Sequence, residues 1–326
     1  MIWPVCKREN MSRKRLISIV IPVYNGEGNI KPLYDTLLPI LNEYQNKYDF
    51  ELIFTDNHSE DQSISELEYL VGIDKRIKVF RFSRNFGYQK SILTGYLKAQ
   101  GDAVVQLDCD LQDPPELIIK FFEYWEAGYD VVYGVRRTRQ EGILITSARK
   151  IFYRLANWLS EDDLPVDAGD FRLIDRKVIN VLHLVDDAQP YLRGMISSMG
   201  FKQYGIPYDR QERKHGKSHF NFSQLVSLAL DGILNHSVLP LRISSYFGIF
   251  VSLLTLLAIF GYIVSKIFFG VNWPKGFTTI TVLILFGISI NAVFLGIIGE
   301  YLGRIYQQVK KKPLVIVEKT ITRDQS

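Results

Sequence analysis

The sequence predicts an α/β fold with a mostly parallel sheet, followed by two C-terminal helices that cross a membrane. Three observations predict it. Short apolar runs alternate with helical segments up to residue 134, a pattern typical of right-handed crossovers between parallel strands. Acidic residues follow two of these runs, where ligands bind in open α/β sheets. Two segments near the C-terminus, 243–265 and 276–299, contain no charged residue.

The first two strands are each followed by a helix. The run 17–25 is apolar except at Ser18 and at Asn25, where it leads into a turn, and a helix is expected at 29–43. The second strand, 51–56, ends on Asp56, and a helix is expected at 63–71. Strands buried in a parallel sheet have such continuous apolar runs.

The same alternation continues through three more strands. These are expected at 78–81, 103–107 and 130–134. Between them, the turn at 83–87 leads into a helix that reaches Ala99, and a second helix is expected at 116–127.

The most informative stretch is Asp-Cys-Asp-Leu-Gln-Asp-Pro-Pro-Glu at 108–116, directly after the fourth strand. Asp108 and Asp110 would share one face if the strand continued, and carboxylates so placed suit Mg²⁺ or Mn²⁺ carrying a diphosphate. Alternatively, these acids only cap the helix and solvate the loop. Asp113 is expected to be the N-cap, in an Asp-x-x-Glu capping box with Glu116.

The two charge-free segments are each longer than the roughly 20 residues that a helix needs to cross a bilayer. The alternative is a buried helical hairpin in a soluble protein. Arg242, Arg304 and Lys310–Lys312 flank the pair, whereas the intervening turn carries only Lys266 and Lys275. Positive charge is enriched on the cytoplasmic side, so both termini are expected there.

Composition narrows the cellular context. Two cysteines provide no disulfide framework, which agrees with a reducing compartment. The net charge of +4 is too small to indicate nucleic-acid binding.

The stretches 142–160 and 222–233 combine apolar, aromatic and polar residues, and either lie in a membrane interface or pack against the sheet. The expected organisation is a tail (1–15), a cytoplasmic α/β domain (16–220), a juxtamembrane amphipathic helix (221–242), a transmembrane hairpin (243–303) and a cytoplasmic C-terminal tail (304–326).

Seven short motifs, in this order and spacing, resemble the polyprenyl-phosphate glycosyltransferases, which are inverting enzymes of the GT-A fold. That family includes dolichol-phosphate mannose synthases and bactoprenol-phosphate glucosyltransferases, and the resemblance runs from Ile17 to about Pro313. The matching motifs are Ile21–Asn25, Ser83–Gly87, Asp108–Glu116, Gly169–Arg172, Arg213–Ser218, Leu230–Ile233 and Ile298–Arg304.

The resemblance implies roles for individual residues. Those that would hold Mg²⁺ or Mn²⁺ are Asp108, Asp110 and Gln112, although Gln112 could instead face solvent. Those that would line the nucleoside site are Pro22, Tyr24, Asn25, Glu27 and Asp56. Those that would contact the acceptor phosphate are Arg136, Arg149 and Arg213, because guanidinium groups suit phosphate oxygens.

Some of these residues also have purely structural interpretations. Asn25 could simply form a turn, and Asp56 could cap the following helix. Asp170 and Arg172 either lie near the active site or form a structural ion pair.

The chain departs from the family at Gly26, where a glutamate is usual, and at Asn57-His58, where Asp-Gly is usual. Both departures lie beside the nucleoside site and could change the preferred donor.

The expected function is transfer of a sugar from a nucleotide donor, such as UDP-glucose, to undecaprenyl phosphate at the cytoplasmic face of a bacterial inner membrane. The small residues Gly287, Gly296 and Gly299 would permit homo-oligomers through helix packing. One alternative is a processive polysaccharide synthase, but its Gln-x-x-Arg-Trp signature is missing from the sequence. The other alternative is an inactive membrane-anchored scaffold.

Overall fold

The computed structural model describes residues 13–137, 168–210, 276–310 and 312–323, with isolated positions between 246 and 268. The chain divides into two compact units. One comprises Met1–Lys150, Asp163–His219 and Pro313–Ser326, and the other comprises Ile151–Asp162 and Phe220–Lys312. Each unit is described by itself.

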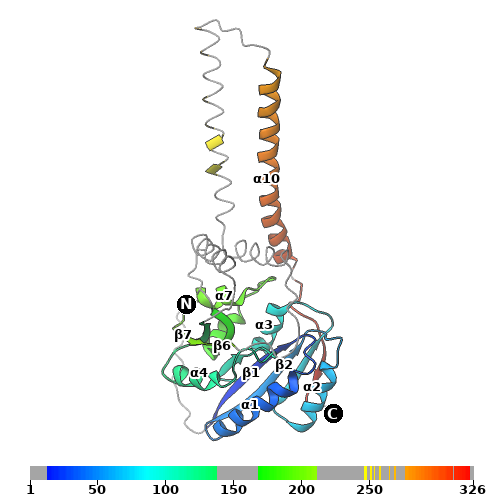
Figure 1. The fold of residues 1–326 in the computed structure, drawn as a ribbon, viewed down its shortest axis with the longest axis vertical. Helices are drawn as coiled ribbons and strands as arrows, with labels where there is room; N and C mark the ends of the chain where they lie inside the picture. The colour runs from blue at the N-terminus through cyan, green and yellow to red at the C-terminus, as the bar shows by residue number, and fades with distance from the viewer. Residues whose placement is uncertain are drawn as a thin grey trace. The chain divides into compact units, whose positions relative to one another are not determined.

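The first unit begins with the predicted alternation of strands and helices (Figure 1), so the α/β prediction is confirmed. The order of these elements is β1 (Arg15–Val23), α1 (Ile30–Tyr44), β2 (Tyr48–Asp56), α2 (Ser63–Ile73), β3 (Ile77–Phe82), α3 (Tyr88–Lys98), β4 (Ala103–Gln106), α4 (Leu117–Glu126) and β5 (Val131–Arg136). Each strand and helix predicted up to residue 134 has a counterpart whose bounds lie within a few residues.

Five further elements follow that the sequence pattern did not predict. They are β6 (Ala168–Asp175), α6 (Arg176–Leu182), α7 (Leu192–Ser198), β7 (Gln203–Tyr208) and β8 (Val317–Ile321). Within the described residues, the strands form an eight-stranded sheet in the order β7-β5-β6-β4-β1-β2-β3-β8. Strands β1 to β4 pair in parallel, whereas β6 and β8 run antiparallel to their neighbours. The sheet is therefore mostly parallel, as predicted.

Apolar layers cover both faces of this sheet. One cluster contains Ile19 of β1 with Leu37 of α1 and Phe121 of α4. The other contains Val20 of β1 with Ile92 of α3. Neighbouring residues of β1 thus face opposite layers and are fully buried, which explains why residues 19–23 are all apolar instead of alternating with polar ones.

The turn between α3 and β4 provides a test of this packing. A Cβ atom on Gly101 would lie 2.6 Å from the backbone nitrogen of Ser18 and 2.7 Å from the carbonyl oxygen of Ala103. We expect Gly101→Ala to lower the free energy of unfolding by about 1–3 kcal/mol, because backbone must move to admit the methyl group. Thermal unfolding of the purified protein measures the change.

The matched control for this substitution is Gly72→Ala. Gly72 lies within α2, and no atom outside its own helical turn lies within 4 Å of the position that a methyl group would take there. Since alanine has the higher helix propensity, we expect the control variant to be at least as stable as the wild type. Equal unfolding midpoints for the two alanine variants would contradict the packing described for Gly101.

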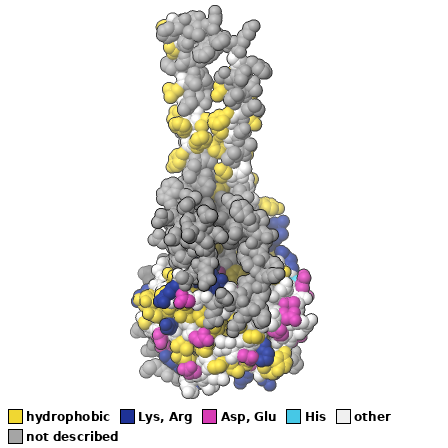
Figure 2. All heavy atoms as spheres, viewed as in Figure 1, with side chains coloured by type: hydrophobic (Ala, Val, Ile, Leu, Met, Phe, Trp, Pro, Cys, Tyr) yellow, Lys and Arg dark blue, Asp and Glu magenta, His cyan; other side chains and the backbone are white. Residues whose placement is uncertain are grey.

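The second unit contains α10 (Phe277–Val309), a helix of 33 residues. Many large apolar side chains are exposed on it and appear as yellow spheres in Figure 2. The charge-free segment 276–299 falls almost entirely within α10, whereas most of the segment 243–265 lies outside the described residues. No helix among the described residues combines the length and apolarity that crossing a membrane requires.

Candidate active site

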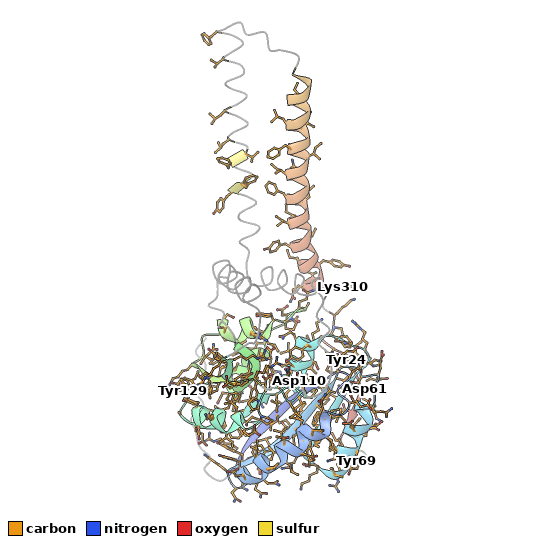
Figure 3. All side chains as sticks on the ribbon, viewed as in Figure 1. Tyr24, Asp61, Tyr69, Asp110, Tyr129 and Lys310 are labelled. Carbon is orange, nitrogen blue, oxygen red and sulfur yellow. The ribbon has the colours of Figure 1, made fainter. Side chains whose placement is uncertain are left out.

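The acidic stretch predicted from the sequence lies at the edge of the sheet where β1, β2 and β4 end. Strand β4 stops at Gln106, and the chain turns at 109–111 instead of continuing as a strand. Leu111 has a positive φ of 57°, a conformation that reverses the chain direction. Asp108 and Asp110 are therefore presented by a turn. Asp110 and Tyr24 lie at this same edge of the sheet (Figure 3).

Asp108 is held by two neighbouring polar side chains. The hydroxyl of Tyr88 donates to its Oδ1 at 2.6 Å, and Nε2 of Gln106 donates to the same atom at 2.8 Å. Burial raises the pKa of Asp108 to about 7, and the charges of Asp113 and Asp110 also raise it, while the Tyr88 hydrogen bond acts in the opposite direction. The site thus concentrates negative charge that a cation would stabilise.

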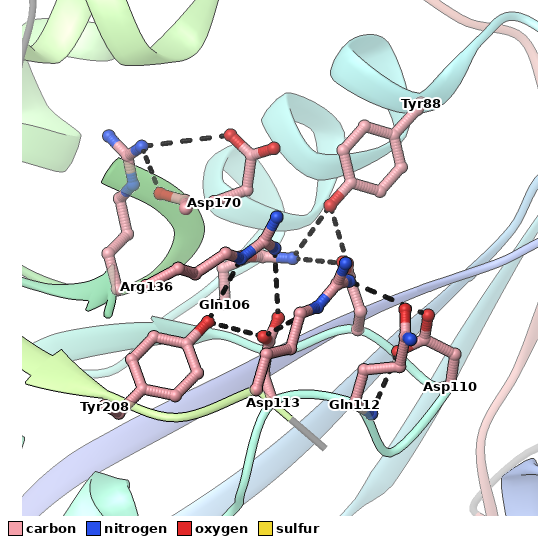
Figure 4. A network of polar contacts seen from close by, with 12 residues as sticks. Tyr88, Gln106, Asp110, Gln112, Asp113, Arg136, Asp170 and Tyr208 are labelled. Carbon is pink, nitrogen blue, oxygen red and sulfur yellow. Dashed lines mark hydrogen bonds and ion pairs between the residues drawn. The ribbon is translucent and has the colours of Figure 1, made fainter. Parts of the chain in front are cut away.

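Asp113 does not cap the helix, so that prediction was wrong. The N-cap of α4 is Glu116, and no side chain makes a capping hydrogen bond. Asp113 is buried and accepts a hydrogen bond at Oδ1 from the hydroxyl of Tyr208 in β7. Arg136 Nη2 lies 3.6 Å from its Oδ2, and Arg210 Nε lies 3.3 Å from its Oδ1 (Figure 4). Asp113 therefore contacts three side chains from distant parts of the chain instead of a backbone N–H at the start of α4.

Arg210 lies between two of the acids. Its Nη2 is 3.9 Å from Asp110 Oδ2, and the same guanidinium contacts Asp113. The backbone N–H of Gln112 donates to Asp110 Oδ1 at 3.2 Å, which fixes the turn. Arg136, predicted to contact phosphate, lies nearby and donates from Nε to Tyr208 at 3.3 Å. The site therefore pairs acids from the β4–α4 loop with arginines at the ends of β5 and β7.

Asp170 forms the ion pair that the sequence left as one alternative, although its main partner is Arg193 of α7. Arg193 donates from Nε and Nη2 to the two carboxylate oxygens at 2.8 and 2.7 Å. Arg172 lies farther away, with Nη2 at 3.8 Å from Oδ1. Burial by itself raises the pKa of Asp170, but the charge and hydrogen bonds of Arg193, helped by Arg172, outweigh it and hold that pKa below its ordinary value.

The predicted nucleoside residues come from the ends of β1 and β2. Pro22 is buried within β1, and Tyr24 is half exposed just beyond it. Asp56 ends β2 and is completely buried; its Oδ1 accepts from the backbone N–H of Ser59 at 3.1 Å. Its Oδ2 lies 3.4 Å from Nη1 of Arg81 and accepts no hydrogen bond among the described residues. Asp56 therefore retains acceptor capacity.

Asn25 and Glu27 mainly organise the loop after β1. Asn25 has a positive φ of 49° and accepts at Oδ1 from the N–H of Glu60 at 2.9 Å. Glu27 accepts at Oε2 from the N–H of Gln62 at 3.3 Å. A Cβ atom at Gly26 would lie 3.2 Å from Cys109 Sγ, so glycine there lets the loop approach the acidic turn closely. Asn25 thus lies in a bend after β1, and its contact with a nucleoside stays a prediction.

The unusual Asn57 is a structural residue. Its Nδ2 donates to Asn85 Oδ1 at 2.8 Å, and its Oδ1 accepts from the N–H of Phe86 at 2.8 Å. The Ser83–Gly87 motif is thereby tied to the end of β2. Arg149 and Arg213, the other two predicted phosphate ligands, lie outside the described residues.

A divalent cation suits these residues. Among the described residues, no three His, Cys, Asp or Glu side chains are grouped closely enough to hold a metal ion unaided. However, the carboxylates of Asp108 and Asp110 with the amide oxygen of Gln112 are hard donors of the kind that Mg²⁺ and Mn²⁺ prefer. Gln106 Oε1 and Asp113 Oδ2 are also buried without a hydrogen-bond partner in the described part of the chain. The donor set and the crowding of acids fit a cation.

The chain is similar in sequence to several known proteins. Residues 18–182 match the family described as Glycosyl transferase family 2. The uncharacterized glycosyltransferase YkcC of Bacillus subtilis is 41% identical over 311 residues, which cover 95% of each chain. The SfII prophage-derived bactoprenol glucosyl transferase of Shigella flexneri is 36% identical over 307 residues, which cover 93% of this chain and 98% of the relative.

Solved structures show a more distant similarity. Glucosyl-3-phosphoglycerate synthase from Mycobacterium tuberculosis, in complex with Mn²⁺, uridine diphosphate and phosphoglyceric acid, is 20% identical with a TM-score of 0.47. The match covers 68% of this chain and 76% of that one.

Proposed function

The chain belongs to glycosyl transferase family 2 and is a glycosyltransferase, and we propose that it transfers a sugar from a nucleoside diphosphate to the phosphate of a polyprenyl lipid. The observation that carries the proposal is that acids of the β4–α4 loop meet two arginines at the carboxyl edge of the sheet. Arg210 lies beside Asp110 and Asp113, and Arg136 lies beside Asp113 (Figure 4). Acids of this kind suit a metal-bound diphosphate, and arginines suit a second phosphate. The names of relatives such as the bactoprenol glucosyl transferase support the lipid acceptor.

We propose a uridine diphosphate sugar as the donor. Asp56 is buried at the end of β2 with one carboxylate oxygen that accepts no hydrogen bond among the described residues. A pyrimidine N–H or a ribose hydroxyl could satisfy that oxygen, and leaving it unsatisfied would be unfavourable. Tyr24 is half exposed nearby and offers a ring on which a base could stack.

The acceptor chemistry requires little from a general base. A phosphate monoester has a second pKa near 6, so it is mostly dianionic at neutral pH and attacks without losing a proton. Asp170, the buried acid beside the site, has a lowered pKa and both oxygens engaged by Arg193, which makes it a weak proton acceptor. We therefore assign Asp170 to holding Arg193 in place. Arg136, held by Asp113 and Tyr208, would orient the acceptor phosphate.

Leaving-group stabilisation completes the proposed chemistry. When bound by Asp108, Asp110 and Gln112, a divalent cation would neutralise charge that develops on the departing diphosphate. Arg210 lies between Asp110 and Asp113 and would add positive charge on the same side. Positioning and electrostatics would then supply most of the catalysis.

We also propose that the protein acts at the cytoplasmic face of a bacterial inner membrane. Support comes from the two charge-free segments, 243–265 and 276–299, with their cationic flanks. The large apolar side chains exposed along α10 are a further support. A polyprenyl phosphate is itself a membrane lipid, so an enzyme that uses it has to reach the bilayer surface.

The test is direct. Cell membranes that contain the protein would be incubated with Mg²⁺, undecaprenyl phosphate and a panel of nucleotide sugars, and the lipid product identified by mass spectrometry. We expect one hexose on the lipid phosphate, formed from a uridine diphosphate donor and lost when EDTA removes divalent cations. A polymer of sugars would instead support the processive synthase, and no lipid product from any donor would contradict the proposal.

A further inference from the structure

The last described strand extends the edge of the sheet beside the proposed nucleoside site. Strand β8 pairs antiparallel with β3, with Thr320 opposite Phe80 and Lys319 opposite Arg81. The N–H of Ser83 also donates to the carbonyl of Ile316 at 3.0 Å. Figure 1 shows this C-terminal segment in red, next to α2. A segment from the far end of the sequence is therefore built into the same sheet as β3.

An irregularity in the pairing places one acidic side chain. The register shifts between Arg81 and Phe82, whose partners are Lys319 and Val317, so Glu318 lies between them without an opposite residue. Such bulges redirect side chains and are frequent near functional sites. Glu318 Oε2 lies 3.7 Å from Nε of Arg81 and 4.0 Å from Nδ1 of His58.

Arg81 connects Glu318 to Asp56. Its Nη1 lies 3.4 Å from Asp56 Oδ2, and its Nη2 donates to the carbonyl of Ser59 at 3.4 Å. One guanidinium therefore serves two carboxylates, of which Asp56 is fully buried and Glu318 is about half exposed. The position of Arg81 decides how much of the Asp56 carboxylate remains available to a ligand.

His58 lies next to Glu318 and contacts the end of β3. Its φ is 64°, and its Nδ1 lies 3.1 Å from the carbonyl oxygen of Phe82. A carbonyl only accepts, so Nδ1 carries the hydrogen in this contact. The unusual histidine after β2 therefore links the β2–α2 loop to the end of β3, next to Glu318.

We propose that β8 forms part of the donor site and that Glu318 is a positioning residue for base recognition. Glu318 draws Arg81 partly away from Asp56, which leaves a carboxylate oxygen of Asp56 able to accept from the nucleobase. Without Glu318, Arg81 would pair with Asp56 alone and compete with the ligand. This inference rests on the proposed uridine diphosphate donor and specifies how the chain recognises it.

The experiment compares Glu318→Gln with Lys319→Gln in the full-length protein. Lys319 is on the same strand but pairs with Glu68 at 2.8 Å on the surface, so it serves as the matched control. Calorimetry with UDP and Mg²⁺ would give the dissociation constant of each variant. We expect Glu318→Gln to weaken UDP binding about tenfold, as expected when one charge-assisted hydrogen bond is weakened, and Lys319→Gln to leave it unchanged.

Further measurements separate positioning from a general structural effect. The donor KM should rise in Glu318→Gln while kcat at saturating donor stays near the wild-type value, and the preference for UDP over ADP should fall. Glu318→Asp, which keeps the charge on a shorter side chain, should recover part of the affinity. Unfolding midpoints of the variants should agree, since exposed ion pairs contribute little to stability.

The outcomes distinguish this inference from the proposed function. Wild-type protein that binds no uridine nucleotide would contradict the donor proposal. Wild-type protein that binds UDP, with Glu318→Gln equal to Lys319→Gln in affinity and base preference, would overturn only the role of β8. A loss of affinity in Glu318→Gln that extends equally to ADP would also overturn it, because base recognition would not be affected.

Discussion

Replacing Asp110 with asparagine is expected to lower kcat by at least about a hundredfold, the loss typical of removing one electrostatic contact to a transition state. Asparagine keeps the size of the side chain and one oxygen, so the turn at 109–111 should persist. It removes the negative charge that would hold a cation against the diphosphate. Steady-state kinetics with saturating donor and acceptor measure the effect.

Binding measurements identify the cause of that loss. Paramagnetic resonance of Mn²⁺ should show weaker metal binding to Asp110→Asn in the presence of UDP, while thermal unfolding stays close to wild type. Glu116→Gln is the matched control, because Glu116 is an exposed acid at the end of the same loop and makes no capping hydrogen bond. Near-wild-type turnover by Asp110→Asn would refute the role assigned to the acidic turn.

The first half of the fold was predictable because its signals are local. Each strand up to β5 is a short, mostly apolar run, and the helices after β1 to β4 begin 6 to 11 residues beyond the strand end. Asp108 and Asp110 could be placed at the active edge for the same reason, since a polar pair directly follows the buried run of β4. Parallel strands then bring separate loops to one edge without any further signal in the sequence.

The partners of those acids could not be predicted from the same signals. Tyr208 reaches Asp113 from 95 residues away, and Arg193 reaches Asp170 from 23 residues away. The Asp-Pro-Pro-Glu sequence has the residue types of a helix cap. Asp113 instead contacts Tyr208, Arg136 and Arg210, which come from distant parts of the chain. Tyr88 and Gln106 were missed because neither belongs to a motif with a metal or phosphate chemistry of its own.

Strand β8 could not be predicted from the sequence for a different reason. Strand β8 is only five residues long and includes Glu318 and Lys319, so it lacks the apolar run that indicates a buried strand. It forms because β3 offers an unpaired edge, and edges are commonly covered in this way. Its contribution to the proposed donor site follows from that pairing.

Replacing Arg193 with methionine is expected to have the second-largest effect, a loss of stability. Asp170 would stay buried without the guanidinium that contacts both its oxygens. Removing Arg193 leaves a buried charge that Arg172, 3.8 Å away, compensates only in part, and we expect a loss of about 3 kcal/mol in the free energy of unfolding. That value is at the low end of the range because Arg193 is partly exposed.

The pH dependence of this loss has a definite sign. In the wild type, Arg193 holds the pKa of Asp170 below its ordinary value, so the pair stabilises the protein above that value and the contribution is lost as pH falls. Without Arg193, burial would raise the pKa of Asp170, so the penalty grows as pH rises through the ordinary carboxyl range. The stability difference between variant and wild type should therefore be largest near pH 7 and shrink below about pH 4.

Asp170 either only holds Arg193 or takes part in the chemistry. Two variants, Asp170→Asn alone and Asp170→Asn combined with Arg193→Met, distinguish these interpretations. The double variant removes the charges of Asp170 and Arg193 together and leaves only the more distant partner Arg172 without its carboxylate, so we expect it to be more stable than Arg193→Met alone. If Asp170 only holds Arg193, the turnover of Asp170→Asn alone should fall much less than that of Asp110→Asn. A loss in Asp170→Asn as large as that in Asp110→Asn, with stability retained, would instead show that the Asp170 carboxylate takes part in the chemistry.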